Sequence, residues 1–78
     1  MDNEIVLYPN PSNGIINLES KSEFDLNIVN VLGQKISSLS LNRYNNFKST
    51  VSLNIESGIY FLEIEGVNGS MIVKLLIN

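Results

Sequence analysis

Two glutamates near the end of the 78-residue chain are the side chains best spaced to do chemistry. Glu63 and Glu65 are two residues apart in a predicted strand, so their carboxylates project from one face, about 7 Å apart. That separation overlaps the spacing of the acid pair in glycoside hydrolases. The alternation of the strand, however, places both on its solvent side, with no apolar enclosure. We interpret the pair as an exposed acidic strand face.

The other chemically active groups do not assemble into a predicted site. Histidine and cysteine are absent, which removes the commonest general base, the commonest transition-metal ligand and any disulfide. Asp2 and Glu4 offer two carboxylates, whereas calcium takes about six to eight oxygen ligands. The serines lack an activating base, and the glycines are too dispersed to cradle a phosphate. We expect no enzyme activity, no cofactor and no tightly bound metal.

Length and charge limit the classes of partner. The chain is short enough to be one domain, and eight acidic against five basic residues give a net charge of −3. The basic residues are scattered singly, which argues against nucleic-acid binding. The opening MDNEIV is not a signal peptide, and apolar runs such as MIV and LLI are far too short to span a bilayer. The protein is therefore either cytoplasmic or a fragment whose export signal lies elsewhere.

Apolar and polar residues alternate with the period of two that indicates β-strands, and no segment keeps the spacing of an amphipathic helix. About seven short strands are expected: Ile5–Tyr8, Ile15–Glu19, Phe24–Val31, Lys35–Leu39, Phe47–Leu53, Ile59–Glu65 and Met71–Ile77. This pattern predicts an all-β fold, an immunoglobulin-like antiparallel β-sandwich.

The individual strands also predict which side chains are buried. In the last strand we expect Met71, Val73, Leu75 and Ile77 to face the core and Lys74 to face solvent. Three apolar residues fall on polar strand faces, so some apolar surface should remain exposed, as an edge covered by a loop or as an interaction patch. These three are Ile15, Ile59 and Phe61.

Two turn signals are specific enough to predict geometry. Asn68-Gly69 separates the last two strands and favours a type I′ hairpin, whose two central residues need positive φ. The sequence ESGIYFL fits a tyrosine corner, in which Gly58 allows the tight bend, Tyr60 donates its hydroxyl back to the corner, and Leu62 enters the core. The alternative is that Tyr60 is simply a large strand residue.

The segment YPNPSNG, Tyr8 to Gly14, is the stiffest part of the chain. Pro9 and Pro11 fix φ, remove two backbone donors and favour extended conformation at the residues before them. Such a segment cannot be a central strand, so we expect it at an edge or bridging two sheets. It is either a rigid structural turn or a preorganised surface that a receptor binds.

Four motifs in order, YPNP with a following glycine, LGQK, GIYF and a lysine in the final strand, resemble the type A C-terminal sorting domain of type IX (Por) secretion. The resemblance runs from about Val6 to the last residue. It implies a recognition motif of eleven residues: Tyr8, Pro9, Asn10, Pro11, Gly14, Leu32, Gly33, Gln34, Gly58, Tyr60 and Lys74.

The resemblance also implies a function and a set of partners. Domains of this family are carried at the C-terminus of proteins secreted by Bacteroidota, and direct an N-terminally attached cargo through the outer-membrane translocon. The implied partners are the translocon, its shuttle proteins and a sortase-like cysteine peptidase that usually removes the domain. The route runs through the periplasm to the cell surface or the medium. Residues 1–78 would be one sorting domain without its cargo, residues 1–4 a linker or expression remnant, and YPNPSNG the junction with the cargo linker.

A different class of function is open from the residues alone. A small β-sandwich accessory module that binds carbohydrate or another protein would have the same fold. Such modules present exposed aromatic residues to sugar rings, whereas tryptophan is absent and Tyr44 is the only tyrosine in a predicted loop. A large cargo domain encoded upstream would favour sorting over this alternative.

Overall fold

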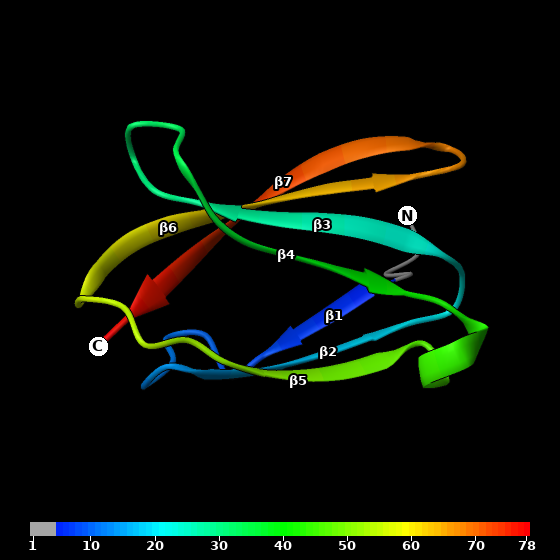
Figure 1. Cartoon of the computed structure of the whole chain (residues 1–78), viewed down its shortest axis with the longest axis horizontal. Helices are drawn as coiled ribbons and strands as arrows, with labels where there is room; N and C mark the ends of the chain where they lie inside the picture. The colour runs from blue at the N-terminus through cyan, green and yellow to red at the C-terminus, as the bar shows by residue number, and fades with distance from the viewer. Residues whose placement is uncertain (1–4) are drawn as a thin grey trace.

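Strict alternation gives each strand one face that must be buried, and two sheets packed face to face satisfy this requirement (Figure 1). The computed structural model describes residues 5–78. A three-stranded sheet has the order β1-β2-β5, and a four-stranded sheet has the order β4-β3-β6-β7, with antiparallel pairing throughout. The strands are β1 (Ile5–Tyr8), β2 (Ile15–Ser20), β3 (Phe24–Val29), β4 (Lys35–Leu41), β5 (Lys48–Ser52), β6 (Gly58–Gly66) and β7 (Gly69–Ile77).

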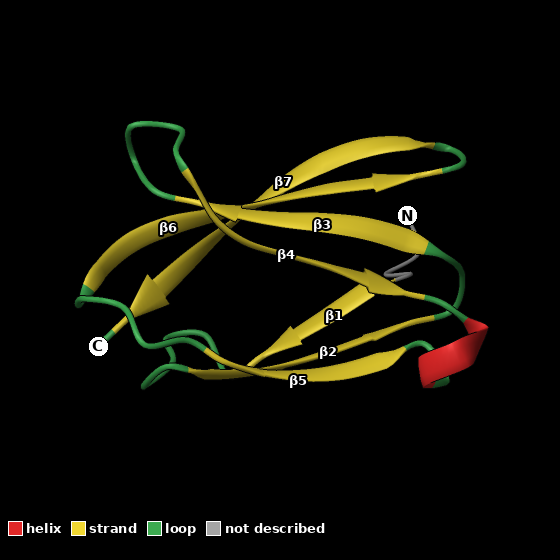
Figure 2. Ribbon diagram, viewed as in Figure 1, coloured by secondary structure: helices red, strands yellow, loops and turns green. Residues whose placement is uncertain are grey.

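The all-β sandwich predicted from the alternation is confirmed, and the seven strands lie where they were expected to within a few residues. Among residues 5–78 the one helical element is a single 3-10 turn, η1 (Arg43–Asn45), in the β4–β5 connection (Figure 2). The side-chain oxygen of Asn42 accepts from the Tyr44 N–H at 2.9 Å and caps this turn. No helix in residues 5–78 is long and apolar enough to cross a membrane.

The core lies between the sheets and is entirely aliphatic. Its nine members are Ile16, Leu18, Leu26, Ile28, Leu41, Leu62, Ile64, Leu75 and Ile77, each at most 5% exposed. Burying a side chain of this size contributes about 1.5–3 kcal/mol, so a few of them decide the stability of so small a domain.

One burial prediction is wrong for part of the last strand. Leu75 and Ile77 are buried, but Val73 is only half-buried and Met71 is 37% exposed. Met71 lies on the edge strand near the β6–β7 turn, where the hairpin curves away from the three-stranded sheet (Figure 1).

The β6–β7 hairpin forms as expected, but its turn is not the predicted type. Gly66 pairs with Gly69, so the two central residues are Val67 and Asn68. Neither has the positive φ that a type I′ turn needs, and the left-handed conformation falls instead on Gly69, with φ of +131°. Gly69 therefore does adopt positive φ, but at the position after the two central residues of the turn and not as one of them.

Candidate functional site

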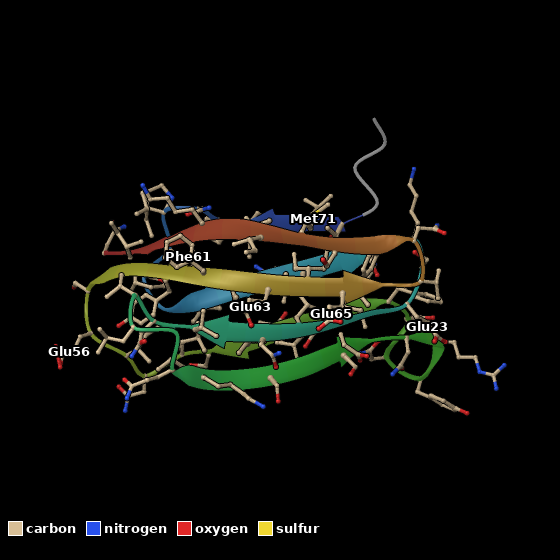
Figure 3. The ribbon with its side chains drawn as sticks, turned by 90° about the horizontal axis from the view of Figure 1, so that it is seen from above. Glu23, Glu56, Phe61, Glu63, Glu65 and Met71 are labelled. Atoms are coloured by element: carbon tan, nitrogen blue, oxygen red, sulfur yellow. The ribbon has the colours of Figure 1, made fainter. Side chains whose placement is uncertain are left out.

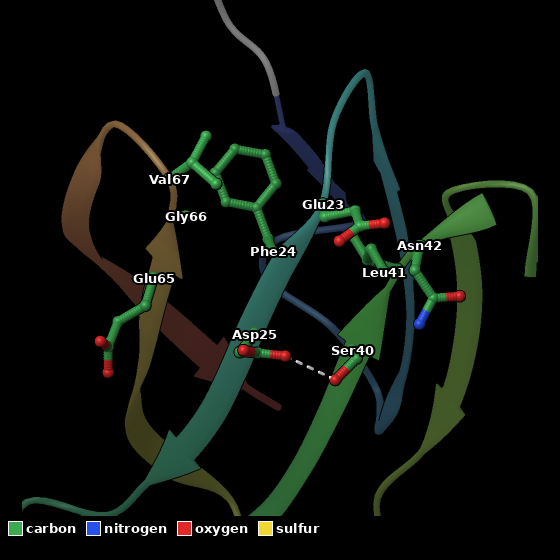
Figure 4. A pocket seen from close by; sticks show the side chains of 9 residues that line it. All are labelled: Glu23, Phe24, Asp25, Ser40, Leu41, Asn42, Glu65, Gly66 and Val67. Carbon is green, nitrogen blue, oxygen red and sulfur yellow. Dashed lines mark hydrogen bonds between the residues drawn. The ribbon is translucent and has the colours of Figure 1, made fainter. Parts of the chain in front are cut away.

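The acidic strand face has the exposed character that was expected. Glu63 and Glu65 point outward from the four-stranded sheet (Figure 3), and Glu65 is directly opposite Asp25 on β3. An open hollow of about 340 Å³ lies at this end of the sheet, and there the Ser40 hydroxyl donates to Asp25 Oδ1 at 2.7 Å (Figure 4). Nothing isolates these carboxylates from water as an acid–base pair would require.

The other groups considered for chemistry do not converge. Within residues 5–78, no three histidine, cysteine, aspartate or glutamate residues lie close enough together to hold a metal ion. Asp2 and Glu4, considered for calcium, lie outside the described residues. Tyr44, the tyrosine considered as a sugar platform, is 85% exposed on η1, and the Arg43 guanidinium lies 5.3 Å from the centre of its ring.

YPNPSNG begins at the last residue of β1 and crosses from one sheet to the other. Tyr8 ends β1, and Ser12 forms a parallel bridge with Ile77 at the edge of the four-stranded sheet. The prediction that this segment lies at an edge or bridges two sheets is therefore confirmed, and the segment does both. The Tyr8 hydroxyl donates to Glu19 Oε2 at 2.5 Å, and this hydrogen bond raises the pKa of the tyrosine.

Asn10, between the two prolines, attaches the opening motif to the last strand. Its side-chain amide donates to the Lys74 carbonyl at 2.8 Å, and its side-chain oxygen accepts from the Leu76 N–H at 3.0 Å. Ser12 continues the contact, because its N–H donates to the Leu76 carbonyl and its carbonyl accepts from the Asn78 N–H, both at 2.8 Å. These four hydrogen bonds, which we call the Asn10 clamp, satisfy backbone groups on the outer edge of β7.

Ser12 also closes the turn that follows, although the sequence analysis gave it no role. It is fully buried, its hydroxyl donates to the Ile15 carbonyl at 2.7 Å, and it accepts from the Gly14 N–H at 3.0 Å. Gly14 has a φ of +115°, and an added Cβ would lie 3.0 Å from the Leu53 carbonyl oxygen. Both its conformation and its surroundings therefore require glycine at this position.

The position of YPNPSNG differs from the predicted junction with a cargo linker. The motif follows β1, and β1 begins toward the end of the sandwich that carries the β6–β7 turn (Figure 1). A chain entering at Ile5 must therefore run the length of β1 before it reaches the motif. The rigid segment therefore holds Asn10 and Ser12 against β7. It does not form the point at which a preceding linker would join the domain.

The tyrosine corner is present. Gly58 opens β6 with a φ of +149°, the Tyr60 hydroxyl donates to the Glu56 carbonyl at 2.7 Å, and Leu62, two residues further on, is fully buried. The bond joins the β5–β6 connection to the strand that follows it. Tyr60 is thus more than a large strand residue.

Tyr60→Phe is expected to lower the free energy of unfolding by about 0.5–1.5 kcal/mol, since one hydrogen bond is lost. Gly58→Val should cost more than about 1 kcal/mol, because valine is strained at the φ of +149° that Gly58 adopts. Nothing lies within 4 Å of the added Cβ, so the cost comes from backbone strain and not from a clash. Urea denaturation of each variant measures both effects. Tyr44→Phe, at an exposed tyrosine, is the control and should leave the midpoint unchanged. A midpoint unmoved in Tyr60→Phe and Gly58→Val would contradict this account of the corner.

The β3–β4 turn carries Leu32, Gly33 and Gln34, and Asn30 holds it together. The Asn30 side-chain oxygen accepts from the N–H groups of Leu32 and Gln34, each at 2.9 Å, and its amide donates to the Gln34 side chain at 2.8 Å. The Gly33 N–H donates to the Asn30 carbonyl at 2.9 Å, and Gly33 has a φ of +82°. The turn is therefore ordered by its own hydrogen bonds and not by packing.

All four motifs lie at one end of the sandwich (Figure 1). Gly58 pairs with Ile77, and Phe61 lies between Val29 and Lys74, so the starts of β6 and the ends of β3 and β7 meet. The Asn10 clamp adds the opening motif to the same end. Lys74 is exposed as predicted, and its carbonyl, not its ammonium, contacts the opening motif.

Two antiparallel sheets with a tyrosine corner define the class of the protein as an immunoglobulin-like β-sandwich. Within that class, residues 6–78 match the model of the secretion system C-terminal sorting domain. The chain belongs to this family, and it is a C-terminal sorting signal of type IX secretion, a kind of domain that is generally non-catalytic. The match supports sorting over an accessory module, and it implies a protein destined for the cell surface or the extracellular space. A search of curated proteins found no match.

Proposed function

We propose that the type IX machinery recognises this domain as a folded surface, at the end of the sandwich where the four motifs meet. The observation that supports the proposal is the distance in sequence between residues that lie together there. Asn10 and Leu76 are 66 positions apart and share a hydrogen bond. An unfolded chain would carry the same letters but would not bring them together.

In this proposal, residues 5–78 act as one domain attached behind a cargo that crosses the inner membrane by a separate signal. The domain folds in the periplasm, where shuttle proteins and the translocon bind it. A sortase-like cysteine peptidase then cleaves the chain ahead of the domain and frees the cargo. The domain itself supplies binding and no catalysis, which agrees with the open, water-exposed setting of its carboxylates. In this proposal the eleven motif residues build the end of the sandwich that the machinery binds, and keep its strands and turns in place.

A folded reporter protein with an ordinary export signal at its N-terminus and this chain at its C-terminus tests the proposal. We expect the reporter outside the cells of a type IX-competent host and in the periplasm of an isogenic host that lacks the translocon. In a host that lacks only the peptidase, the exported reporter should retain the domain. Equal retention of the reporter in the competent and the translocon-deficient hosts would contradict the proposed function.

A further inference from the structure

Four residues lie next to one another across the four-stranded sheet. In the strand register, Val29 on β3 is opposite Phe61 on β6, and Phe61 is opposite Lys74 on β7, so these three share the outer face, with Val29 buried among its neighbours. On the other side, Val29 pairs with the exposed Lys35 of β4 at a shift in the β3–β4 register, so a lysine stands at each edge of the sheet. Neither lysine has a carboxylate of the described residues within 4 Å.

The charge on this face changes sign along the strands. The next row toward the β6–β7 turn places Asn27 opposite Glu63, and the row after it places Asp25 opposite Glu65 (Figure 3). Like charges directly opposed on a sheet disfavour each other. The face therefore has a basic, apolar end beside the motifs and an acidic end away from them.

The β3–β4 turn rises from the outer side of the four-stranded sheet at its basic end (Figure 1). It carries two exposed aliphatic side chains. Val31 is 68% exposed and Leu32 is 79% exposed, although the turn is ordered by the hydrogen bonds of Asn30. Val31 also lines a shallow hollow of about 280 Å³, whose apolar side is formed with Val29, Phe61 and Ile72 and whose side toward the acidic end is formed by Glu63. An ordered backbone lowers the entropy that these apolar side chains lose on binding, which suits them as binding anchors.

We infer that Val31 and Leu32, with Phe61 and Ile72 beside them, form a docking surface for a protein of the export machinery. The inference rests on the proposed function. The partner it fits has an apolar pocket that receives the turn, bordered by carboxylates that meet Lys35 and Lys74. We call the six residues Val31, Leu32, Lys35, Phe61, Ile72 and Lys74 the tip surface.

The charges on the face disfavour other occupants. An anionic lipid surface or a nucleic acid would be repelled by Glu63, which borders the tip surface, and by Asp25 and Glu65 further along the same face. A second copy packed face to face by a two-fold axis would bring lysines against lysines, or the apolar end against carboxylates. A partner whose apolar pocket has an acidic border avoids both conflicts.

The test exchanges apolar for polar side chains without changing the turn. Val31→Thr combined with Leu32→Gln should keep the Tm of the purified chain within a few degrees, since both side chains are exposed. Export of the reporter in the competent host should fall at least about tenfold. Val67→Thr is the matched control, because Val67 is 88% exposed in the turn at the opposite end, and it should be exported like the parent.

A second pair of variants tests the charge requirement. Lys35→Glu with Lys74→Glu should lower export, whereas Lys35→Arg with Lys74→Arg should preserve it. Parental export of the folded Val31/Leu32 variant would overturn the tip surface and leave the proposed function standing. An equal fall in Val67→Thr would also overturn it, as would a parent chain that sediments as a dimer and becomes monomeric in the Val31/Leu32 variant. If the parent itself is not exported, the proposed function fails first.

Discussion

Deletion of residues 74–78 is expected to unfold the domain. The deletion removes Leu75 and Ile77 from the core, and burial of two such side chains contributes about 3–6 kcal/mol. A domain of this size has a total stability of about 5 kcal/mol. The deletion also removes the part of β7 that pairs with residues 58–61 of β6, and it removes every partner of the Asn10 clamp.

Far-UV circular dichroism and urea denaturation measure this effect directly. The shortened chain should lose its β-sheet spectrum and show no cooperative transition, whereas the parent should unfold in one step. Deletion of Asn78 alone is the matched control. It removes one hydrogen bond to Ser12 and should cost only about 0.5–1.5 kcal/mol. A cooperative transition at the parental midpoint in the chain ending at residue 73 would refute this role of the last strand.

Loss of the Asn10 side chain is the second large effect expected. Asn10→Ala removes two hydrogen bonds to β7 and should lower the free energy of unfolding by about 1–3 kcal/mol. In a domain of this length, each kcal/mol lowers the Tm by about 4–8 °C. Asn13→Ala, in the same loop and also exposed, should change the Tm little. Equal Tm values for the two variants would show that the clamp does not hold the last strand.

Asn10→Asp separates the two hydrogen bonds of the clamp. The carboxylate can still accept from the Leu76 N–H, but it has no proton to donate to the Lys74 carbonyl. We therefore expect a loss of stability at neutral pH that is at least half that of Asn10→Ala. A variant as stable as the parent at neutral pH would show that the donated bond is unimportant.

The strands were predictable because their signal is local. Alternation places Leu26 and Ile28 inward and Asp25 and Asn27 outward, and the structure keeps that assignment. The tyrosine corner was also readable, since Gly58, Tyr60 and Leu62 lie within five consecutive residues. In each case the sequence neighbours are also the neighbours in space.

The features that sequence reasoning missed depend on distant contacts. Nothing beside Asn10 indicates that its amide binds a strand more than sixty residues later. The exposure of Met71 follows from the way the β6–β7 hairpin curves away from the opposing sheet near its turn. YPNPSNG was recognisable as a rigid segment, but its rigidity gave no indication of the strand that it holds.

The central claim is that the export machinery binds a folded surface and not a linear tag. The most direct test is export of the reporter that carries Leu62→Asp, measured as the fraction outside the cells of a type IX-competent host. Leu62 is fully buried, so a charge at this position should unfold the domain while all four motifs stay in the sequence. Val67→Asp makes the same exchange at an exposed site and should be exported like the parent. We expect the Leu62→Asp reporter to stay in the periplasm, and efficient export of that unfolded chain would show that the export machinery reads a linear signal.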